Sequence, residues 1–172
     1  MEGKINKIAD FKDKSLLIVD DDGPFRDRLA RSMEKKGFIV TQAEGVKSGV
    51  NKAIEIKPAF AVIDLRLEDG NGLEVVKKIQ ESKRESRIVM LTGYGNIPTT
   101  VAAIKAGALD YLAKPADAED VETALLADPS KKADPPENPM SADRAKWEHI
   151  HRVFELCNRN VSDTARRLKM HR

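Results

Sequence analysis

Residues 60–72 read FAVIDLRLEDGNG, and this stretch decides the fold. Its first four residues are apolar without alternation, which is typical of a β-strand that is covered on both faces. A single acid, Asp64, follows the apolar run at once, and a polar loop that contains two glycines comes next. The stretch therefore predicts an inner strand of a parallel sheet, with one carboxylate at its carboxyl end.

The same unit recurs on both sides of this stretch. Apolar or β-rich runs that we expect to form strands lie at residues 16–19, 38–41, 60–63, 88–91 and 111–113. Helical patterns lie between and after them, at residues 24–36, 46–56, 72–83, 99–106 and 118–126. Strand–helix repeats of this length imply right-handed crossovers and a parallel sheet with helices on both faces. We expect an α/β domain over residues 12–127, built on a five-stranded parallel doubly wound sheet.

The chain changes character after this domain. Residues 128–139 include four prolines in twelve positions, so we expect a semi-extended linker there. Residues 140–172 contain eight Lys or Arg and four Asp or Glu, whereas the net charge of all 172 residues is +2. A basic tail behind an acidic body is typical of a segment that meets a polyanion, although a solvated helix surface has the same balance.

Several classes of protein are disfavoured by composition. One cysteine, Cys157, excludes an internal disulfide. No apolar run approaches the ~20 residues of a membrane span, and the first residues lack an apolar stretch of signal-peptide length. No GxxxxGK loop occurs, which excludes a regulator with an ATPase domain. We expect a cytoplasmic protein that makes no contact with a membrane.

Chemistry-bearing side chains follow the predicted strands. Ligands of a doubly wound sheet bind at the carboxyl ends of its strands, where the chain direction switches. The side chains expected at this edge are Asp20, Asp21, Asp64, Thr92 and Lys114. Several carboxylates in one cleft repel one another, and Mg²⁺, which prefers oxygen ligands, relieves that repulsion. Together with an ammonium and a hydroxyl for phosphate oxygens, the set predicts phosphoryl transfer to a carboxylate, with Asp64 as the nucleophile.

These residues carry a resemblance to a known family. The segments VDDDGPFR, VIDLRLEDGNGLE, MLTGYG and DYLAKP occur in this order and resemble the receiver domains of two-component response regulators. The resemblance covers about residues 15–126 and implies a flavodoxin-like sheet. It further implies that a sensor histidine kinase is the partner that supplies the phosphoryl group. The protein would then be no enzyme beyond its own phosphorylation and dephosphorylation.

The resemblance also assigns roles within the site. It implies that Asp64 is the phosphoacceptor and that Asp20, Asp21, Asp64 and the backbone carbonyl of Arg66 bind Mg²⁺. Thr92 and Lys114 would contact the phosphoryl oxygens.

A conformational switch is implied as well. In the family, Thr92 moves toward the phosphate and Tyr111 turns inward, and the resulting change promotes a phosphorylation-dependent homodimer. A new charge of about −2 would bias this two-state element.

Plainer structural roles remain open for the same side chains. Asp20, Asp21 and Asp22 precede a proline and fit a helix N-cap, the role that suits Asp22 best. Thr92 could be a turn residue, and Tyr111 could be a half-buried core residue. Lys114 could be a charged residue at the surface.

The first acidic cluster also fits a function from another class of protein. Residues 17–23 also resemble the first motif of haloacid-dehalogenase-type phosphatases, in which Asp20 would be the nucleophile and Asp22 the acid/base. Such enzymes need a further acidic pair after a later strand, where this chain has Lys114 and Pro115. Asp64 would then have no role.

The tail resembles a DNA-binding segment. Residues 140–160 fit one amphipathic helix, and a second is expected to open at Val161 or Ser162. The segment NVSDTARRL resembles a Fis-type helix-turn-helix. With the receiver and the linker, it resembles the ActR/PrrA/RegA family of redox-responsive transcription regulators. Phosphate contacts in this partial all-α DNA-binding domain, residues 140–172, are expected from Arg166, Arg167, Lys169 and Arg172.

The chain departs from that family at its end, which falls in the turn of the motif, so the recognition helix is expected to be missing. A stand-alone phosphoryl-relay receiver that acts by protein–protein contact is therefore the alternative to a DNA-binding regulator.

The 172-residue chain is expected to bind DNA weakly and with little sequence preference. Phosphate contacts position a protein on DNA, whereas a helix in the major groove reads the bases. An electrophoretic mobility-shift assay with a promoter fragment and a scrambled fragment of equal length measures both properties. Tight binding to one fragment alone would contradict the expectation.

Overall fold

The computed structural model describes residues 6–93 and 97–128, the single positions 150, 153 and 157, and residues 160–168. The chain divides into two compact units, Met1–Lys131 and Lys132–Arg172.

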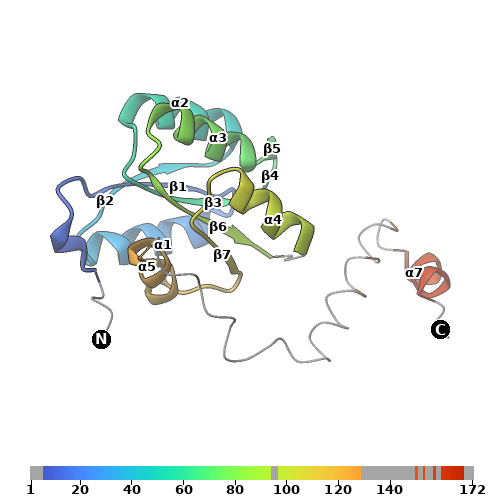
Figure 1. The fold of residues 1–172 in the computed structure, drawn as a ribbon. Coiled ribbons are helices and arrows are strands. Elements are labelled where there is room, and N and C mark those ends of the chain that lie inside the picture. The colour runs from blue at the N-terminus through green and yellow to red at the C-terminus, as the bar shows by residue number, and fades with distance from the viewer. Residues whose placement is uncertain are drawn as a thin grey trace. The chain divides into compact units, whose positions relative to one another are not determined.

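The first unit is built on a five-stranded parallel sheet in the order β2-β1-β3-β6-β7 (Figure 1). Its strands are β1 (Ser15–Val19), β2 (Ile39–Ala43), β3 (Phe60–Asp64), β6 (Arg87–Thr92) and β7 (Asp110–Ala113). The predicted α/β doubly wound fold is confirmed. Because β1 and β3 lie side by side while their connections leave in opposite directions, a topological switch point lies between their carboxyl ends.

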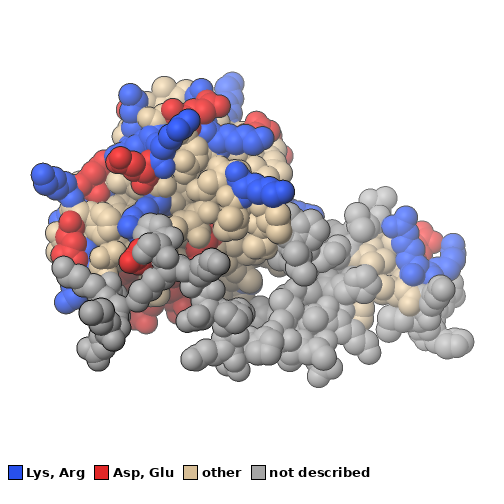
Figure 2. Space-filling model, viewed as in Figure 1, with Lys and Arg blue, Asp and Glu red and all other residues tan. Residues whose placement is uncertain are grey.

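Helices cover both faces of the sheet. They are α1 (Gly23–Lys35), α2 (Val46–Ile56), α3 (Leu73–Ser82), α4 (Ile97–Lys105) and α5 (Ala118–Leu126). Figure 1 shows α2 and α3 on one face and α1 and α5 on the other. Acidic and basic side chains are interspersed over α2 and α3 in Figure 2, as expected from the nearly balanced composition.

Burial explains why the strands read as unbroken apolar runs. Leu17 and Val19 of β1 pack into the core layer under α2 and α3, while Leu16 and Ile18 pack into the layer under α1 and α5. All four side chains are fully buried. A strand with a core on each face has no position for a polar side chain until it ends, and the acids follow at that point.

The structure differs from the sequence prediction after β3. A two-stranded antiparallel hairpin, β4 (Arg66–Leu67) and β5 (Gly70–Asn71), forms where we expected a loop. Leu67 is buried on the core side of the hairpin, so the segment gains burial that its polar composition does not suggest. Smaller shifts occur elsewhere: β2 runs to Ala43, two residues beyond the predicted end, and α4 begins at Ile97, two residues early.

The second unit contains α7 (Val161–Arg167). The side chain of Asn160 caps this helix by accepting hydrogen bonds from the backbone amides of Ser162 and Asp163, at 3.0 and 3.2 Å. The prediction that a helix opens at Val161 or Ser162 is confirmed at Val161. Most of the predicted 140–160 helix lies outside the described residues.

In the parts of the chain that the structure describes, none of the helices has the length and apolar character needed to cross a membrane.

Gly72, at the end of the hairpin, has a steric reason to be glycine. A Cβ atom there would overlap the backbone oxygen of Asp64 and would lie 2.9 Å from Cγ2 of Ile63. We expect Gly72→Ala to lower the free energy of unfolding by about 3 kcal/mol, because the backbone must move to accept the methyl group.

Gly93→Ala is the matched control. A Cβ atom at Gly93 meets no heavy atom of the described residues within 4 Å, so the expected change is within about 0.5 kcal/mol. Urea denaturation followed by circular dichroism measures both variants. Equal effects of the two substitutions would show that Gly72 is not sterically required.

Candidate active site

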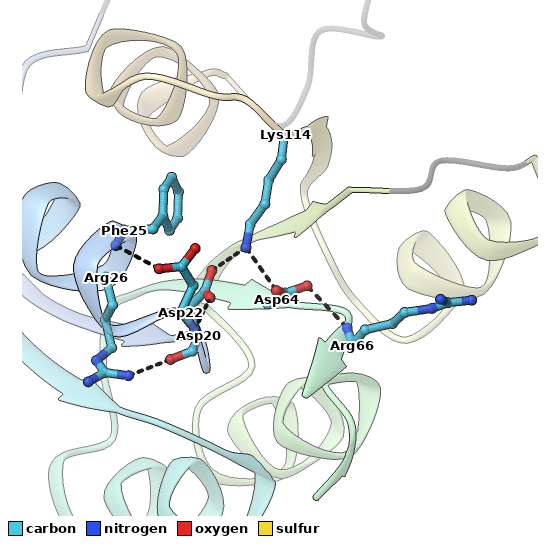
Figure 3. A network of polar contacts seen from close by, with 7 residues as sticks. All are labelled: Asp20, Asp22, Phe25, Arg26, Asp64, Arg66 and Lys114. Atoms are coloured by element: carbon cyan, nitrogen blue, oxygen red, sulfur yellow. Dashed lines mark hydrogen bonds and ion pairs between the residues drawn. The ribbon is translucent and has the colours of Figure 1, made fainter. Parts of the chain in front are cut away.

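The site is organised around an ammonium group that bridges two buried carboxylates (Figure 3). Nζ of Lys114 lies 2.6 Å from Oδ2 of Asp20 and 2.9 Å from Oδ2 of Asp64. The three residues follow or end β7, β1 and β3, so the sheet brings together groups that are far apart in sequence. Asp20 is 1% exposed and Asp64 is 7% exposed, which makes the pairing electrostatically strong.

A third carboxylate completes an acidic cluster that fits a divalent cation. One carboxylate oxygen from each of Asp20, Asp21 and Asp64 lies within 4.8 Å of the other two. Asp21 is exposed, so the cluster opens to solvent on that side. Hard oxygen donors with solvent access suit Mg²⁺, which retains several of its waters.

The loop after β1 is held by its own hydrogen bonds. Oδ1 of Asp20 accepts from the backbone amide of Asp22 at 2.9 Å. Nη1 of Arg26 donates to the backbone oxygen of Asp20 at 2.6 Å, and Nε of Arg26 donates to Oε1 of Gln42 at 3.1 Å. These contacts fix the backbone that carries Asp20, so the carboxylate points to Lys114 (Figure 3).

Asp22 acts as the helix cap that the sequence suggested. Its Oδ1 accepts a hydrogen bond from the backbone amide of Phe25 at 3.0 Å, at the N-terminus of α1. Pro24 occupies the first turn, where its missing amide proton costs nothing. The carboxylate of Asp22 is therefore committed to α1.

The other oxygen of Asp64 is held by the hairpin. Oδ1 of Asp64 accepts from the backbone amide of Arg66 at 3.1 Å. The guanidinium of Arg66 points away from Asp64 in Figure 3, so the backbone of Arg66 faces the site. The backbone of Arg66, whose carbonyl is the predicted metal ligand, therefore lies beside Asp64.

Thr92 and Tyr111 lie on the neighbouring strands. Thr92 ends β6, one residue past Leu91, the register partner of Asp64, and is buried. The backbone amide of Lys114 donates to the backbone oxygen of Thr92 at 2.8 Å, which ties the two positions together. Tyr111 of β7 is half-buried against the core layer under α2 and α3, and its hydroxyl oxygen is buried.

Burial and charge shift the pKa values of the two central groups. Burial raises the pKa of the Asp64 carboxyl, and the hydrogen bond from Lys114 offsets only part of that effect. Burial also lowers the pKa of Lys114, but its hydrogen bonds to Asp20 and Asp64 outweigh burial and raise the pKa above its ordinary value. Lys114 therefore keeps its positive charge between the two carboxylates.

Two contacts were not expected from the sequence. Nζ of Lys114 lies 4.6 Å from the ring centroid of Phe25, which places an aromatic face against the ammonium. The contact between Arg26 and Gln42 joins α1 to β2. Phe25 and Arg26 belong to the VDDDGPFR segment, but nothing in the sequence singled out Gln42.

The proposed DNA contacts of the tail are only partly described. Arg166 and Arg167 are exposed on α7, where Figure 2 shows basic side chains at the surface. Arg166 lies 3.3 Å from Asp163 in an exposed ion pair. Lys169 and Arg172 lie outside the described residues.

Comparison with known proteins identifies a family and several relatives that this chain resembles. Residues 16–126 match the response regulator receiver domain family. The chain is 61% identical over 160 residues to the acid tolerance regulatory protein ActR of Rhizobium meliloti, covering 93% of this chain and 82% of that protein. It is 64% identical over 160 residues to the photosynthetic apparatus regulatory protein RegA of Rhodobacter capsulatus, covering 93% and 87%.

Solved structures of similar fold include a response regulator protein from Burkholderia pseudomallei with a phosphorylated aspartic acid, calcium ion and citrate. The TM-score is 0.69 at 39% identity, over 92% of this chain and 94% of that chain. A CheY-like receiver domain protein from Methanospirillum hungatei has a TM-score of 0.60 at 30% identity, over 63% of this chain and 87% of that chain.

Lys114→Met is expected to destabilise the metal-free protein by about 3 kcal/mol, because Asp20 and Asp64 lose their counter-charge while buried. Mg²⁺ bound at this cluster would supply positive charge to the same carboxylates. Saturating Mg²⁺ should therefore recover more stability in Lys114→Met than in the unmodified protein. Urea denaturation in a chelator and in excess Mg²⁺ measures the difference.

Lys36→Met serves as the control, since Lys36 forms a 2.6 Å ion pair with Glu122 and both side chains are partly exposed. This variant should lose less stability, and Mg²⁺ should not restore it. An equal response of both variants to Mg²⁺ would argue against a cation site at Asp20 and Asp64.

Proposed function

The chain belongs to the ActR/PrrA/RegA family of two-component response regulators, and on that premise we propose that Asp64 is its phosphoacceptor. The observation that carries the proposal is the position of Asp64, which is buried, lies at the switch point of the sheet, and is paired with Lys114. The donor would be a phosphohistidine of a sensor histidine kinase.

Mg²⁺ would be held by carboxylate oxygens of Asp20, Asp21 and Asp64 and by the backbone carbonyl of Arg66. When bound, the ion offsets negative charge on the incoming phosphoryl group and lowers its repulsion from the acids. The spacing of the three carboxylates supports this ligand set.

The residues of the chain carry the transfer itself. A carboxylate oxygen of Asp64 attacks phosphorus in line with the leaving imidazole of the kinase. The new P–O bond forms as the P–N bond breaks, and the electron pair of the P–N bond returns to the imidazole nitrogen. Lys114 contacts a phosphoryl oxygen from its position between Asp20 and Asp64, and the Thr92 hydroxyl donates to another.

Phosphorylation would be transmitted through Thr92 and Tyr111. The phosphoryl group adds about −2 charge beside the end of β6. Thr92 moves toward that charge, and Tyr111 of the adjacent strand β7 repacks inward. Register pairing of Met90 with Tyr111 and of Thr92 with Ala113 supports this route, because it joins the two strands directly. The surface of α4, β7 and α5 would then favour a homodimer.

The output would be control of transcription through the tail. ActR and RegA are named as regulatory proteins, and the similarity to this chain extends beyond the receiver domain. We infer that Arg166 and Arg167 of α7 contact DNA phosphates, together with Lys169 and Arg172. The chain would catalyse no reaction other than its own phosphorylation and dephosphorylation.

Asp64→Asn tests the acceptor. With acetyl phosphate and Mg²⁺, the unmodified chain should gain one phosphoryl group in intact mass spectrometry, and Asp64→Asn should gain none because an amide is not a nucleophile for phosphorus. Asp22→Asn should be phosphorylated as the unmodified chain is, since asparagine caps a helix as well as aspartate does.

The same pair of variants discriminates against the phosphatase alternative. A phosphatase that uses Asp20 and Asp22 would retain its adduct in Asp64→Asn and lose activity in Asp22→Asn. Peptide mapping that found phosphate on Asp20 would overturn the assignment of Asp64.

A further inference from the structure

The hairpin after Asp64 is fastened to a helix that the proposed reaction does not use. Asp69 lies at its tip, between β4 and β5. Oδ1 of Asp69 accepts from the backbone amide of Val46 at 2.7 Å, and Oδ2 accepts from the backbone amide of Lys47 at 3.1 Å. Both amides belong to the first turn of α2, so one carboxylate spans from the hairpin to the helix.

The Asp69 carboxylate caps the first turn of helix α2. Its N-cap residue is Gly45, which has no side chain to accept hydrogen bonds from the first turn. A carboxylate at a helix N-terminus is favoured by the free amides and by the helix dipole. The hydrogen bonds from Val46 and Lys47 accordingly hold the pKa of Asp69 below its ordinary value.

Gly45 provides the space that Asp69 fills. A Cβ atom at Gly45 would lie 2.6 Å from Oδ1 of Asp69 and 2.8 Å from its Cγ and Oδ2. The φ angle of Gly45 is −161°, an extended conformation that any residue adopts. Close approach of the Asp69 carboxylate is therefore the reason that this position favours glycine.

The opposite end of the hairpin holds the acceptor. The backbone amide of Arg66 donates to Oδ1 of Asp64, and the amide of Gly72 donates to the oxygen of Leu65 at 2.9 Å. Each strand of the hairpin has only two residues, so its own ladder offers little rigidity. A fixed tip limits how far the Arg66 peptide can tilt relative to Asp64.

We propose that Asp69 is a positioning residue for the acceptor site, which clasps the hairpin tip to α2 and thereby holds the Arg66 backbone in place beside Asp64. The inference rests on the proposed function, because the Arg66 carbonyl matters as a ligand only if a cation binds there. Asp69 itself touches neither the cation nor the phosphoryl group.

Asp69→Asn is the first test, and Glu68→Gln is its matched control. Both substitutions remove one negative charge from an exposed side chain at the hairpin tip. They differ because the Asp69 carboxylate accepts the hydrogen bonds from the first turn of α2. An asparagine side chain can accept a hydrogen bond from one of the two backbone amides, Val46 or Lys47. Its NH₂ group, which cannot accept a hydrogen bond, then faces the other amide.

Isothermal titration with Mg²⁺ on the full chain should show binding about tenfold weaker for Asp69→Asn, as for loss of a supporting contact around a metal site. For Glu68→Gln the change should stay within about twofold, because the exposed charge is screened. Hydrogen exchange of the backbone amides in residues 65–72 should increase only in Asp69→Asn.

Gly45→Ala tests the clasp from the helix side. The methyl group should displace the Asp69 carboxylate and weaken Mg²⁺ binding as Asp69→Asn does. Adding Asp69→Ala to Gly45→Ala should cause little further loss, because both substitutions break the same contact.

Equal Mg²⁺ affinity and equal exchange in Asp69→Asn and Glu68→Gln would overturn the role of Asp69. That result differs from failure of the proposed function, in which the unmodified chain itself would neither bind Mg²⁺ at this site nor accept a phosphoryl group.

Discussion

The ion bridge from Lys114 to Asp20 and Asp64 is the interaction on which the site depends. It joins the ends of three strands, and it places a positive charge, 21% exposed, against two carboxylates that are almost fully buried. Without a counter-charge these carboxylates would destabilise the folded state. The surrounding hydrogen bonds that involve Arg26 and the backbone amides of Asp22 and Arg66 orient the bridge. The fold therefore holds a charged cluster at the carboxyl ends of the parallel strands.

Added charge at this cluster would change the balance between the ammonium and the two carboxylates. Lys114 forms ion pairs with the carboxylates of Asp20 and Asp64, and a divalent ion would take over part of that role. An incoming phosphoryl group would then meet an ammonium that is already in position and would not need to reorganise the site. The hydrogen bond from the backbone amide of Lys114 to the backbone oxygen of Thr92 would give the same event a path into β6 and β7.

Most of this could be predicted from the sequence, for a physical reason. A strand buried on both faces must be apolar, so Asp20 and Asp64 mark where β1 and β3 end, and topology then brings them together. Contacts between side chains of separate segments leave no such periodic pattern. The hydrogen bond between Arg26 and Gln42 and the hydrogen bonds of Asp69 to α2 are contacts of this kind. The hairpin was missed for a different reason, because its two-residue strands are too short to show alternation.

The most direct test of the account is a crystal structure of the chain grown with Mg²⁺ and beryllofluoride, which mimics a phosphoryl group on a carboxylate. We expect beryllium bonded to a carboxylate oxygen of Asp64, Mg²⁺ held among Asp20, Asp21, Asp64 and the Arg66 carbonyl, and the Lys114 ammonium on a fluorine. Beryllium bonded to Asp20, or Mg²⁺ bound away from Asp64, would contradict it.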